Sequence, residues 1–298
     1  MSAPTASPTA WLVTGATGQL GTDLQTLLTG ADVTALGRRE LDLTDEAAVR
    51  AVVGRWRDDA LARGARPVVL NAAAYTAVDA AEGDEEVAGL VNGAAPGWLA
   101  QELAGRGRLV HVSTDYVFDG DATRPYRTDD EPGPRTAYGR TKLAGERAVA
   151  SVDDDAVVVR TAWVYAAHGR NFVRTMLRLE SERDQVSVVT DQTGSPTWSA
   201  DLARGLVEVA QSPARGLLHA TGTGSTTWHG LARTVFAGAG ADPARVLPVP
   251  TSAYPTPAPR PAYSVLDTAG WTAAGLTPLP AWEHSLRDCL TALGALRA

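Results

Sequence analysis

Short apolar runs alternate with longer segments of helical periodicity along the first half of the chain. The runs are typical of buried strands, and the segments between them carry apolar residues three or four positions apart. This alternation predicts an α/β fold with a Rossmann-type, doubly wound parallel sheet that helices cover on both faces. We predict strands at residues 11–13, 33–36, 68–70, 109–112 and 157–159, with helices from about 20 to 28 and at 44–62, 87–103 and 138–149.

The second half of the chain is less regular. We predict strands at 186–189 and 216–219 and helices at 172–179, 199–209 and 280–296, with Ser199 as the N-cap of the second helix. Six prolines between residues 247 and 261 predict an extended or turned segment there, suited to form one wall of a substrate site.

Composition narrows the class of protein. With 44% hydrophobic and 20% charged residues in 298, the chain has ordinary globular usage. The formal charge of -7 disfavours binding to nucleic acid, and no apolar run is long enough for a membrane helix. A single cysteine, Cys289, excludes a disulfide framework, so we expect a cytoplasmic protein without membrane or nucleic-acid partners.

A glycine-rich loop follows the first predicted strand and opens the first helix. Its sequence, GATGQLG at residues 15–21, places Gly15, Gly18 and Gly21 where backbone amides and a helix N-terminus can bind a pyrophosphate. A plain glycine turn is the alternative, but the strand and helix context favours a dinucleotide.

The end of the second predicted strand indicates which dinucleotide. An acidic residue there binds the ribose hydroxyls of NAD, whereas this chain has Gly37, Arg38 and Arg39. Two guanidinium groups can clamp a 2′-phosphate, so we predict NADPH, with NADH left open and a solvated turn as the alternative. Asp42 follows this turn and is placed to approach the adenine.

The candidate catalytic residues come from the fourth strand and the helix after it. Tyr138 and Lys142 stand four residues apart, on one face of a helix, where the ammonium can stabilise a phenolate. Thr114 follows the strand at 109–112, at the carboxyl edge of the sheet, and its hydroxyl can polarise a carbonyl; local turn capping is the alternative.

These motifs together resemble the extended short-chain dehydrogenase/reductase superfamily and, within it, the dTDP-4-dehydrorhamnose reductase family. The resemblance spans nearly the whole folded chain. The matching segments are TGATGQLG at 14–21, NAAAYTAVD at 71–79, STDYVFDG at 113–120, YGRTKLAGE at 138–146, RTAWVY at 160–165, NFV at 171–173, DQTGSPT at 191–197, and Arg260 and Pro261 with SVLD at 264–267.

The resemblance implies a role for each matching residue. Tyr138 would donate the proton, Lys142 would lower its pKa and hold the nicotinamide ribose, and Thr114 would orient the substrate carbonyl. The predicted cofactor positions are Gly15, Thr17, Gly18, Gln19, Leu20, Gly21, Arg38, Arg39, Asp42, Leu43, Ala73, Ala74, Tyr75, Thr76, Tyr138 and Lys142, and the substrate positions are Thr114, Asp115, Trp163 and Arg260.

The implied activity is NADPH-dependent reduction of the 4-keto group of a dTDP-4-dehydro-6-deoxy-L-hexose, first dTDP-4-dehydro-β-L-rhamnose to dTDP-L-rhamnose. Related dehydratases carry an acid where this chain has Tyr116, which favours reduction over dehydration. The alternatives are a reductase of a sister dTDP-4-keto sugar, such as a dTDP-dihydrostreptose synthase, and a non-catalytic NADP-binding regulatory subunit. The intact set of catalytic residues argues against the regulatory subunit.

Two positions depart from the family pattern. Tyr263 replaces the usual asparagine, and we expect it to be bulky near the nucleotide-sugar pocket. Ala200 stands where some relatives supply a metal-binding glutamate, so we expect no metal and prefer a monomer over a homodimer. We divide the chain into a disordered tail at 1–10, an NADP-binding Rossmann domain at 11–165 and a mainly substrate-binding region at 166–298, from which some segments return to the Rossmann domain.

Overall fold

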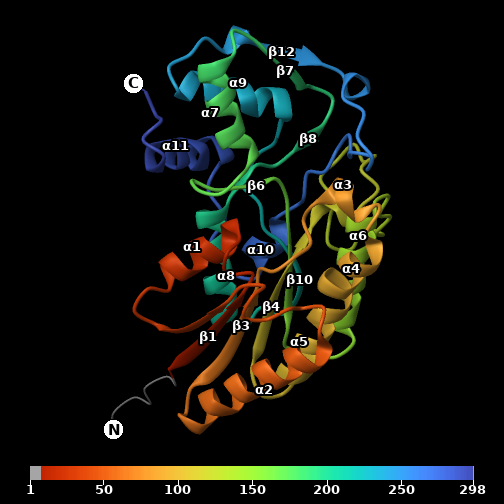
Figure 1. Ribbon diagram of the computed structural model, residues 1–298, viewed down its shortest axis with the longest axis vertical. Helices are drawn as coiled ribbons and strands as arrows, with labels where there is room; N and C mark the ends of the chain where they lie inside the picture. Colours follow the sequence, from red (N-terminus) through yellow and green to blue (C-terminus); the bar gives the residue numbers. More distant parts are fainter. Residues whose placement is uncertain (1–7, 298) are drawn as a thin grey trace.

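The computed structural model describes residues 8–297 and centres on one parallel sheet (Figure 1). Six strands lie in the order β10-β5-β4-β3-β1-β2. The chain runs from β1 to β2 at one edge and then crosses back to β3 on the other side of β1, so the strand order reverses between β1 and β3, as in doubly wound folds. The predicted fold class is confirmed. The strands are β1 (Thr9–Thr14), β2 (Asp32–Leu36), β3 (Arg66–Asn71), β4 (Arg108–Thr114), β5 (Val157–Thr161) and β10 (Gly216–His219).

Helices cover both faces of this sheet. Successive residues of β1 point to opposite sides, so Trp11 and Val13 pack on one face and Leu12 on the other. The first face is covered by α1 (Gln19–Leu27), α8 (Ser199–Gln211) and α10 (Ala269–Ala273), and the second by α2 (Glu46–Ala62), α5 (Ala95–Leu103) and α6 (Ala137–Ala150). Burial on both sides explains the almost continuous apolar runs in the strands.

A smaller group of elements lies at one end of the molecule, beyond the sheet (Figure 1). It has its own apolar core, built around Val173, Phe236 and Leu286. It consists of α7 (Phe172–Glu182), α9 (Trp228–Gly238), α11 (Trp282–Ala292), the paired strands β7 (Val186–Val189) and β12 (Val246–Val249), and the short pairs of β6 (Val164–Tyr165) with β9 (Thr197–Trp198) and of β8 (Thr193–Gly194) with β11 (Thr226–Thr227). Although they follow residue 165, α8, β10 and α10 pack with the sheet.

Several boundaries differ from the sequence predictions. β1 begins at Thr9, where it continues the pairing with Arg66, so the predicted tail is too long by two residues; its first seven residues lie outside the described part. The helix predicted at 87–103 is α4 (Glu85–Gly89), a π-helical turn η1 (Leu90–Ala94) and α5. The wider turn brings Asn92 inward, where its amide bonds both backbone groups of Tyr75 (2.8 and 3.1 Å).

The second half brings further corrections. Ser199 is the first residue of α8 and not its N-cap; its hydroxyl donates to the Asp23 carboxylate. The proline-rich segment is extended and turned as predicted: it forms the edge strand β12, where the ring of Pro248 is tolerated, and the short helix η4 (Thr251–Ala253). The last helix is shorter than predicted, from Trp282 to Ala292. The remaining short elements are α3 (Val78–Ala81), η2 (Asp115–Val117) and η3 (Pro243–Arg245).

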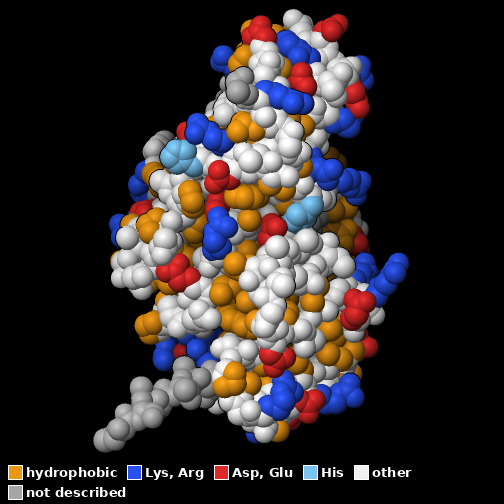
Figure 2. All heavy atoms as spheres, turned by 90° about the vertical axis from the view of Figure 1, so that its left-hand side faces the viewer, with side chains coloured by type: hydrophobic (Ala, Val, Ile, Leu, Met, Phe, Trp, Pro, Cys, Tyr) orange, Lys and Arg blue, Asp and Glu red, His pale blue; other side chains and the backbone are white. Residues whose placement is uncertain are grey.

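The surface has the mixed character that the composition suggests. On the face drawn in Figure 2, basic and acidic side chains are interspersed around apolar ones. In the described residues, no helix is both long enough and apolar enough to span a bilayer.

Trp271 joins α10 to α8 and should contribute strongly to stability. It is 1% exposed, packs against Gly205 and donates a hydrogen bond from Nε1 to the carbonyl oxygen of Thr277 (2.8 Å). We expect Trp271→Ala to lower the free energy of unfolding by about 3–5 kcal/mol, because it leaves a large cavity. The control Leu27→Ala, at a site 43% exposed, should change it by no more than about 0.5 kcal/mol. Denaturant unfolding measures both, and equal midpoints would contradict this assignment.

Candidate active site

A cavity of about 670 Å³ opens at the carboxyl ends of the strands. Its walls come from the loops after β1, β2, β3 and β4, from α6, and from the region around Trp163 and Trp228. The loops after β1 and β3 meet at the point where the strand order reverses, which is where ligands bind in doubly wound folds.

The glycine loop is packed so closely that side chains are excluded. Gly15 has φ 68°, and a Cβ there would lie 2.6 Å from the backbone nitrogen of Ala73. A Cβ on Gly21 would lie 2.2 Å from the carbonyl oxygen of Gly15. Gly18 is the N-cap of α1 and offers no side-chain acceptor to the first amides of the helix. These amides are thus left for an anion at the cavity wall.

Most predicted cofactor residues line the cavity, and two do not. Gly21 is buried behind the loop, where its role is close packing, and Arg39 is exposed outside the lining. Arg38 does line the cavity, so the predicted clamp contains one arginine here. The predicted cofactor residues in the lining are Gly15, Thr17, Gly18, Gln19, Leu20, Arg38, Asp42, Leu43, Ala73, Ala74, Tyr75, Thr76, Tyr138 and Lys142.

Asp42 is held in a local turn beside Arg38. Its carboxylate accepts hydrogen bonds from the backbone nitrogen (3.0 Å) and hydroxyl (2.8 Å) of Thr44. These bonds, and the charge of Arg38, lower the pKa of Asp42. The site therefore places one fixed carboxylate at this end of the cavity, beside a guanidinium that forms no ion pair within residues 8–297.

The three predicted catalytic side chains meet in this cavity. Thr136 caps α6 by accepting from the backbone nitrogen of Gly139 (3.0 Å), so the helix starts one residue before Tyr138. Tyr138 and Lys142 then lie one turn apart, opposite Thr114 at the end of β4. Sequence spacing alone indicated this pairing, and the cap explains why it holds.

The electrostatic environment of the three residues is dominated by burial. Desolvation raises the pKa of Tyr138 to about 12, against the opposing effect of the Thr114 hydroxyl, and lowers the pKa of Lys142 to about 8. The amine of Lys142 donates to the carbonyl oxygen of Val112 (2.6 Å). At neutral pH the phenol thus keeps its proton and the amine is mostly charged, the combination that proton donation to an alkoxide needs.

Asp115 and Tyr116 line the cavity next to Thr114. Asp115 accepts a hydrogen bond from the Thr114 hydroxyl (2.9 Å), and burial raises the pKa of this carboxyl to about 6. The ring of Tyr116 meets that of Tyr138 edge to face, with centroids 5.6 Å apart. Burial also raises the pKa of Tyr116, so it is a neutral phenol and no general base at neutral pH.

Trp163 lines the cavity in a strained conformation. Its φ is 49°, in the left-handed region that a bulky residue rarely adopts, and its ring stacks on Trp228 at 3.6 Å. Gly194 allows this, because a Cβ there would lie 2.4 Å from the Trp163 ring. Sequence reasoning missed Trp228, which starts α9 in the irregular half of the chain and belongs to no motif.

Three substrate-side expectations do not match the cavity lining. The proline-rich segment contributes no wall of it, and Arg260 instead pairs with Asp79 (2.6 Å), which lowers the pKa of that carboxyl. Tyr263 is also outside the lining; its ring packs against the cluster of Phe118, Tyr126 and Leu266. These contacts join segments far apart in the sequence, which motif spacing cannot reveal.

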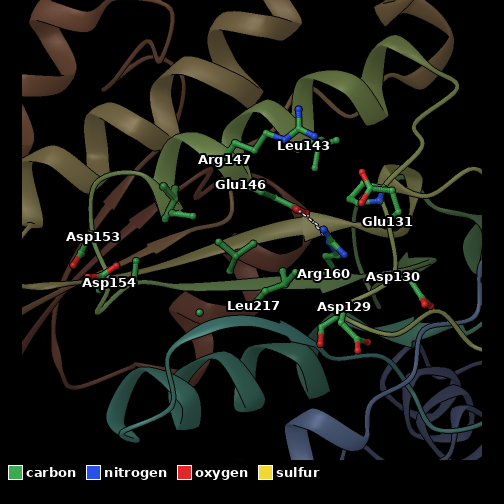
Figure 3. A pocket seen from close by; sticks show the side chains of 17 residues that line it. Asp129, Asp130, Glu131, Leu143, Glu146, Arg147, Asp153, Asp154, Arg160 and Leu217 are labelled. Atoms are coloured by element: carbon green, nitrogen blue, oxygen red, sulfur yellow. Dashed lines mark hydrogen bonds and ion pairs between the residues drawn. The ribbon is translucent and has the colours of Figure 1, made fainter.

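A second cavity, of about 520 Å³, lies between α6 and the edge strand β10 (Figure 3). Glu146 and Arg160 line it and form a buried ion pair with each other (2.6 Å). It holds neither the glycine loop nor Tyr138, so the candidate active site is the larger cavity.

Comparison with known proteins agrees with this geometry. The family model of the RmlD substrate binding domain matches residues 9–295. The chain belongs to this family. A dTDP-4-dehydrorhamnose reductase of Streptomyces griseus is 52% identical over 95% of this chain and 93% of its own length. A crystal structure of dTDP-4-dehydrorhamnose reductase from Bacillus anthracis in complex with NADP superposes with a TM-score of 0.89 at 35% identity, covering 95% of this chain and 99% of the other.

Another similar protein carries a name that refers to a different dTDP sugar. A probable dTDP-4,6-dihydroxy-2-methyloxan-3-one 4-ketoreductase of Streptomyces antibioticus is 50% identical over 93% of both chains. Close similarity within the family therefore spans more than one named sugar.

Arg38 and Arg39 provide a matched test of the predicted phosphate clamp. We expect Arg38→Ala to weaken NADPH about tenfold or more and NADH little, because one charge-assisted hydrogen bond to a phosphate is lost. Arg39→Ala, at an equally exposed site outside the cavity, should leave both affinities unchanged. Fluorescence titration with the two dinucleotides measures this. Equal losses for NADPH and NADH in Arg38→Ala would contradict the clamp.

Proposed function

We propose that the chain is an NADPH-dependent reductase that converts the 4-keto group of a dTDP-4-dehydro-6-deoxy-L-hexose into a hydroxyl group. The first candidate substrate is dTDP-4-dehydro-β-L-rhamnose, with dTDP-L-rhamnose as product. The observation that carries this proposal is the meeting of Thr114, Tyr138 and Lys142 in one cavity with the glycine loop.

NADPH, when bound, supplies the hydride for the carbonyl carbon. The amides at the start of α1 and Arg38 bind its phosphates in this account. Thr114 orients the substrate carbonyl, and Tyr138 gives its proton to the oxygen as negative charge develops there. The ammonium of Lys142 stabilises the phenolate that forms when Tyr138 loses its proton. The stacked rings of Trp163 and Trp228 form the wall on the substrate side.

The residue at position 116 supports reduction over dehydration. A dehydratase needs a base there to remove a proton from the sugar, and Tyr116 is a buried phenol that keeps its own proton. Reduction requires only a hydride and one proton, which Tyr138 supplies. The names of the relatives from Streptomyces griseus and Bacillus anthracis support the same reaction and the same cofactor.

A sister keto sugar is the second candidate. The relative from Streptomyces antibioticus, and a dTDP-4-keto-6-deoxy-D-glucose reductase of Streptomyces niveus that is 47% identical, carry names for other dTDP sugars. The monomeric state and the cytoplasmic location stay predictions, as does the division into domains.

The first experiment follows the absorbance of NADPH with purified protein and dTDP-4-dehydrorhamnose and identifies the sugar formed. Oxidation of NADPH with formation of dTDP-L-rhamnose supports the first candidate. Turnover only with another dTDP-4-keto sugar supports the second. NADPH binding without turnover on any of these sugars would contradict the proposal and favour a regulatory subunit.

Tyr138→Phe separates proton donation from binding. We expect kcat to fall by about 10²–10⁴-fold, the usual contribution of a positioned acid, with the affinity for NADPH changed less than threefold. Tyr126→Phe is the matched control, since its phenol bonds Asp119 (2.6 Å) outside the cavity. Equal activity of Tyr138→Phe and the native protein would remove Tyr138 as the donor.

A further inference from the structure

A row of polar side chains crosses the sheet behind Lys142. Thr14, Asn71 and His111 are paired neighbours on β1, β3 and β4, so their side chains share one face of the sheet. All three, and Lys142, are at most 1% exposed. Burying such a row costs free energy unless every member is hydrogen-bonded, whereas apolar residues would pack here without that cost.

The row is hydrogen-bonded throughout and ends at the lysine. Thr14 Oγ1 donates to Asn71 Oδ1 (2.6 Å), and Asn71 Nδ2 lies 2.9 Å from His111 Nδ1. On the other side of the ring, His111 Nε2 lies 3.4 Å from the amine nitrogen of Lys142. The imidazole therefore bridges the row and the amine.

The direction of these bonds depends on the charge of Lys142. With the nitrogen of Asn71 toward the ring, the imidazole proton sits on Nε2 and faces an uncharged amine. If the Asn71 amide rotates by half a turn, its oxygen accepts a hydrogen bond from His111 Nδ1. Its nitrogen then donates to the Thr14 hydroxyl oxygen, since a hydroxyl group can accept as well as donate. Nε2 is then free to accept from an ammonium. Because a hydrogen bond to a charged donor is the stronger one, the row favours the charged amine.

The ring itself stays neutral. Burial and the nearby charge of Lys142 hold the pKa of His111 well below its ordinary value, so one ring nitrogen remains available as an acceptor.

We propose that His111 is a positioning residue for the reductase proposed above: its neutral imidazole accepts a hydrogen bond from the Lys142 ammonium and, through Asn71 and Thr14, joins it to the strand that leads into the glycine loop. The inference rests on that proposed function for its catalytic meaning, but the effect on Lys142 is measurable without turnover.

The other charged and titratable groups around Lys142 do not replace His111. Tyr138 and Glu146 stand on α6, Asp115 on η2 and Arg160 on β5. Glu146 favours the charged amine at a distance, but its carboxylate is bonded by Arg160 (2.9 and 2.6 Å; Figure 3) and by the Ser113 hydroxyl (2.5 Å).

Lys142 is the only lysine of the 298-residue sequence, which makes a direct test simple. Protein that contains lysine labelled with ¹³C at Cε gives one side-chain NMR signal, whose titration reports the pKa of Lys142. In His111→Phe we expect the midpoint to fall by on the order of one pH unit, because the ammonium loses an acceptor. In His111→Gln, whose amide oxygen can accept, at least half of the shift should be recovered.

His219→Phe is the matched control. His219 is a second buried histidine of the same sheet, bonded through Nδ1 to the carbonyl oxygen of Asp267 (3.1 Å). Its replacement should leave the Lys142 midpoint unchanged. An unchanged midpoint in His111→Phe, an equal shift in His219→Phe, or no recovery in His111→Gln overturns the proposal.

Activity supplies the separate check on mechanism. If the native protein reduces the sugar, His111→Phe should lose kcat at a lower pH on the basic side, by the same interval as the NMR midpoint. A shifted NMR midpoint in a protein that turns over no sugar would leave His111 acting on Lys142 and contradict the proposed function alone. If the basic limb of the kcat profile does not shift with the NMR midpoint of Lys142, then His111 does not influence catalysis through Lys142.

Discussion

The structure depends on keeping one positive charge inside the protein at the carboxyl edge of the sheet. Lys142 is 1% exposed, and burial lowers its pKa to about 8 against the opposing effect of the Glu146 charge. Polar groups are brought to the buried amine: the carbonyl oxygen of Val112 lies at 2.6 Å and the ring of His111 at 3.4 Å. The site is thus built as much from β4 and its neighbours as from the helix that carries the catalytic pair.

The glycine loop meets the same requirement from the opposite side. A loop that binds a phosphate must bring its backbone amides close to it without a side chain between them. Gly15 and Gly21 allow this, because they pack so closely against backbone atoms that a Cβ at either position would clash. The loops after β1 and β3 then close on each other, and Thr14 and Asn71, at the ends of those strands, are hydrogen-bonded to each other. The strand that leads into the glycine loop is consequently joined to Lys142 by one buried row of polar side chains.

Local features of the sequence sufficed to predict the sheet, the glycine loop and the pair of Tyr138 and Lys142, because each depends on periodicity or spacing within a few residues. Features that depend on distant segments were missed. Trp228 stacks on Trp163 although the two belong to separate elements far apart in the sequence, and Arg260 pairs with Asp79, which lies 181 positions away. The π-helical turn at Leu90–Ala94 likewise accompanies a tertiary contact, between Asn92 and Tyr75, and helical periodicity in the sequence does not predict that contact.

In the proposed reaction, this cavity brings a hydride to the carbon and the Tyr138 proton to the oxygen of one carbonyl group. NADPH that carries deuterium at the transferred position tests this reaction, with the sugar product examined by NMR. We expect deuterium bound at carbon 4 of the dTDP-6-deoxyhexose, with a hydroxyl group on the same carbon. A product without deuterium at carbon 4, or with deuterium at another carbon, would contradict it.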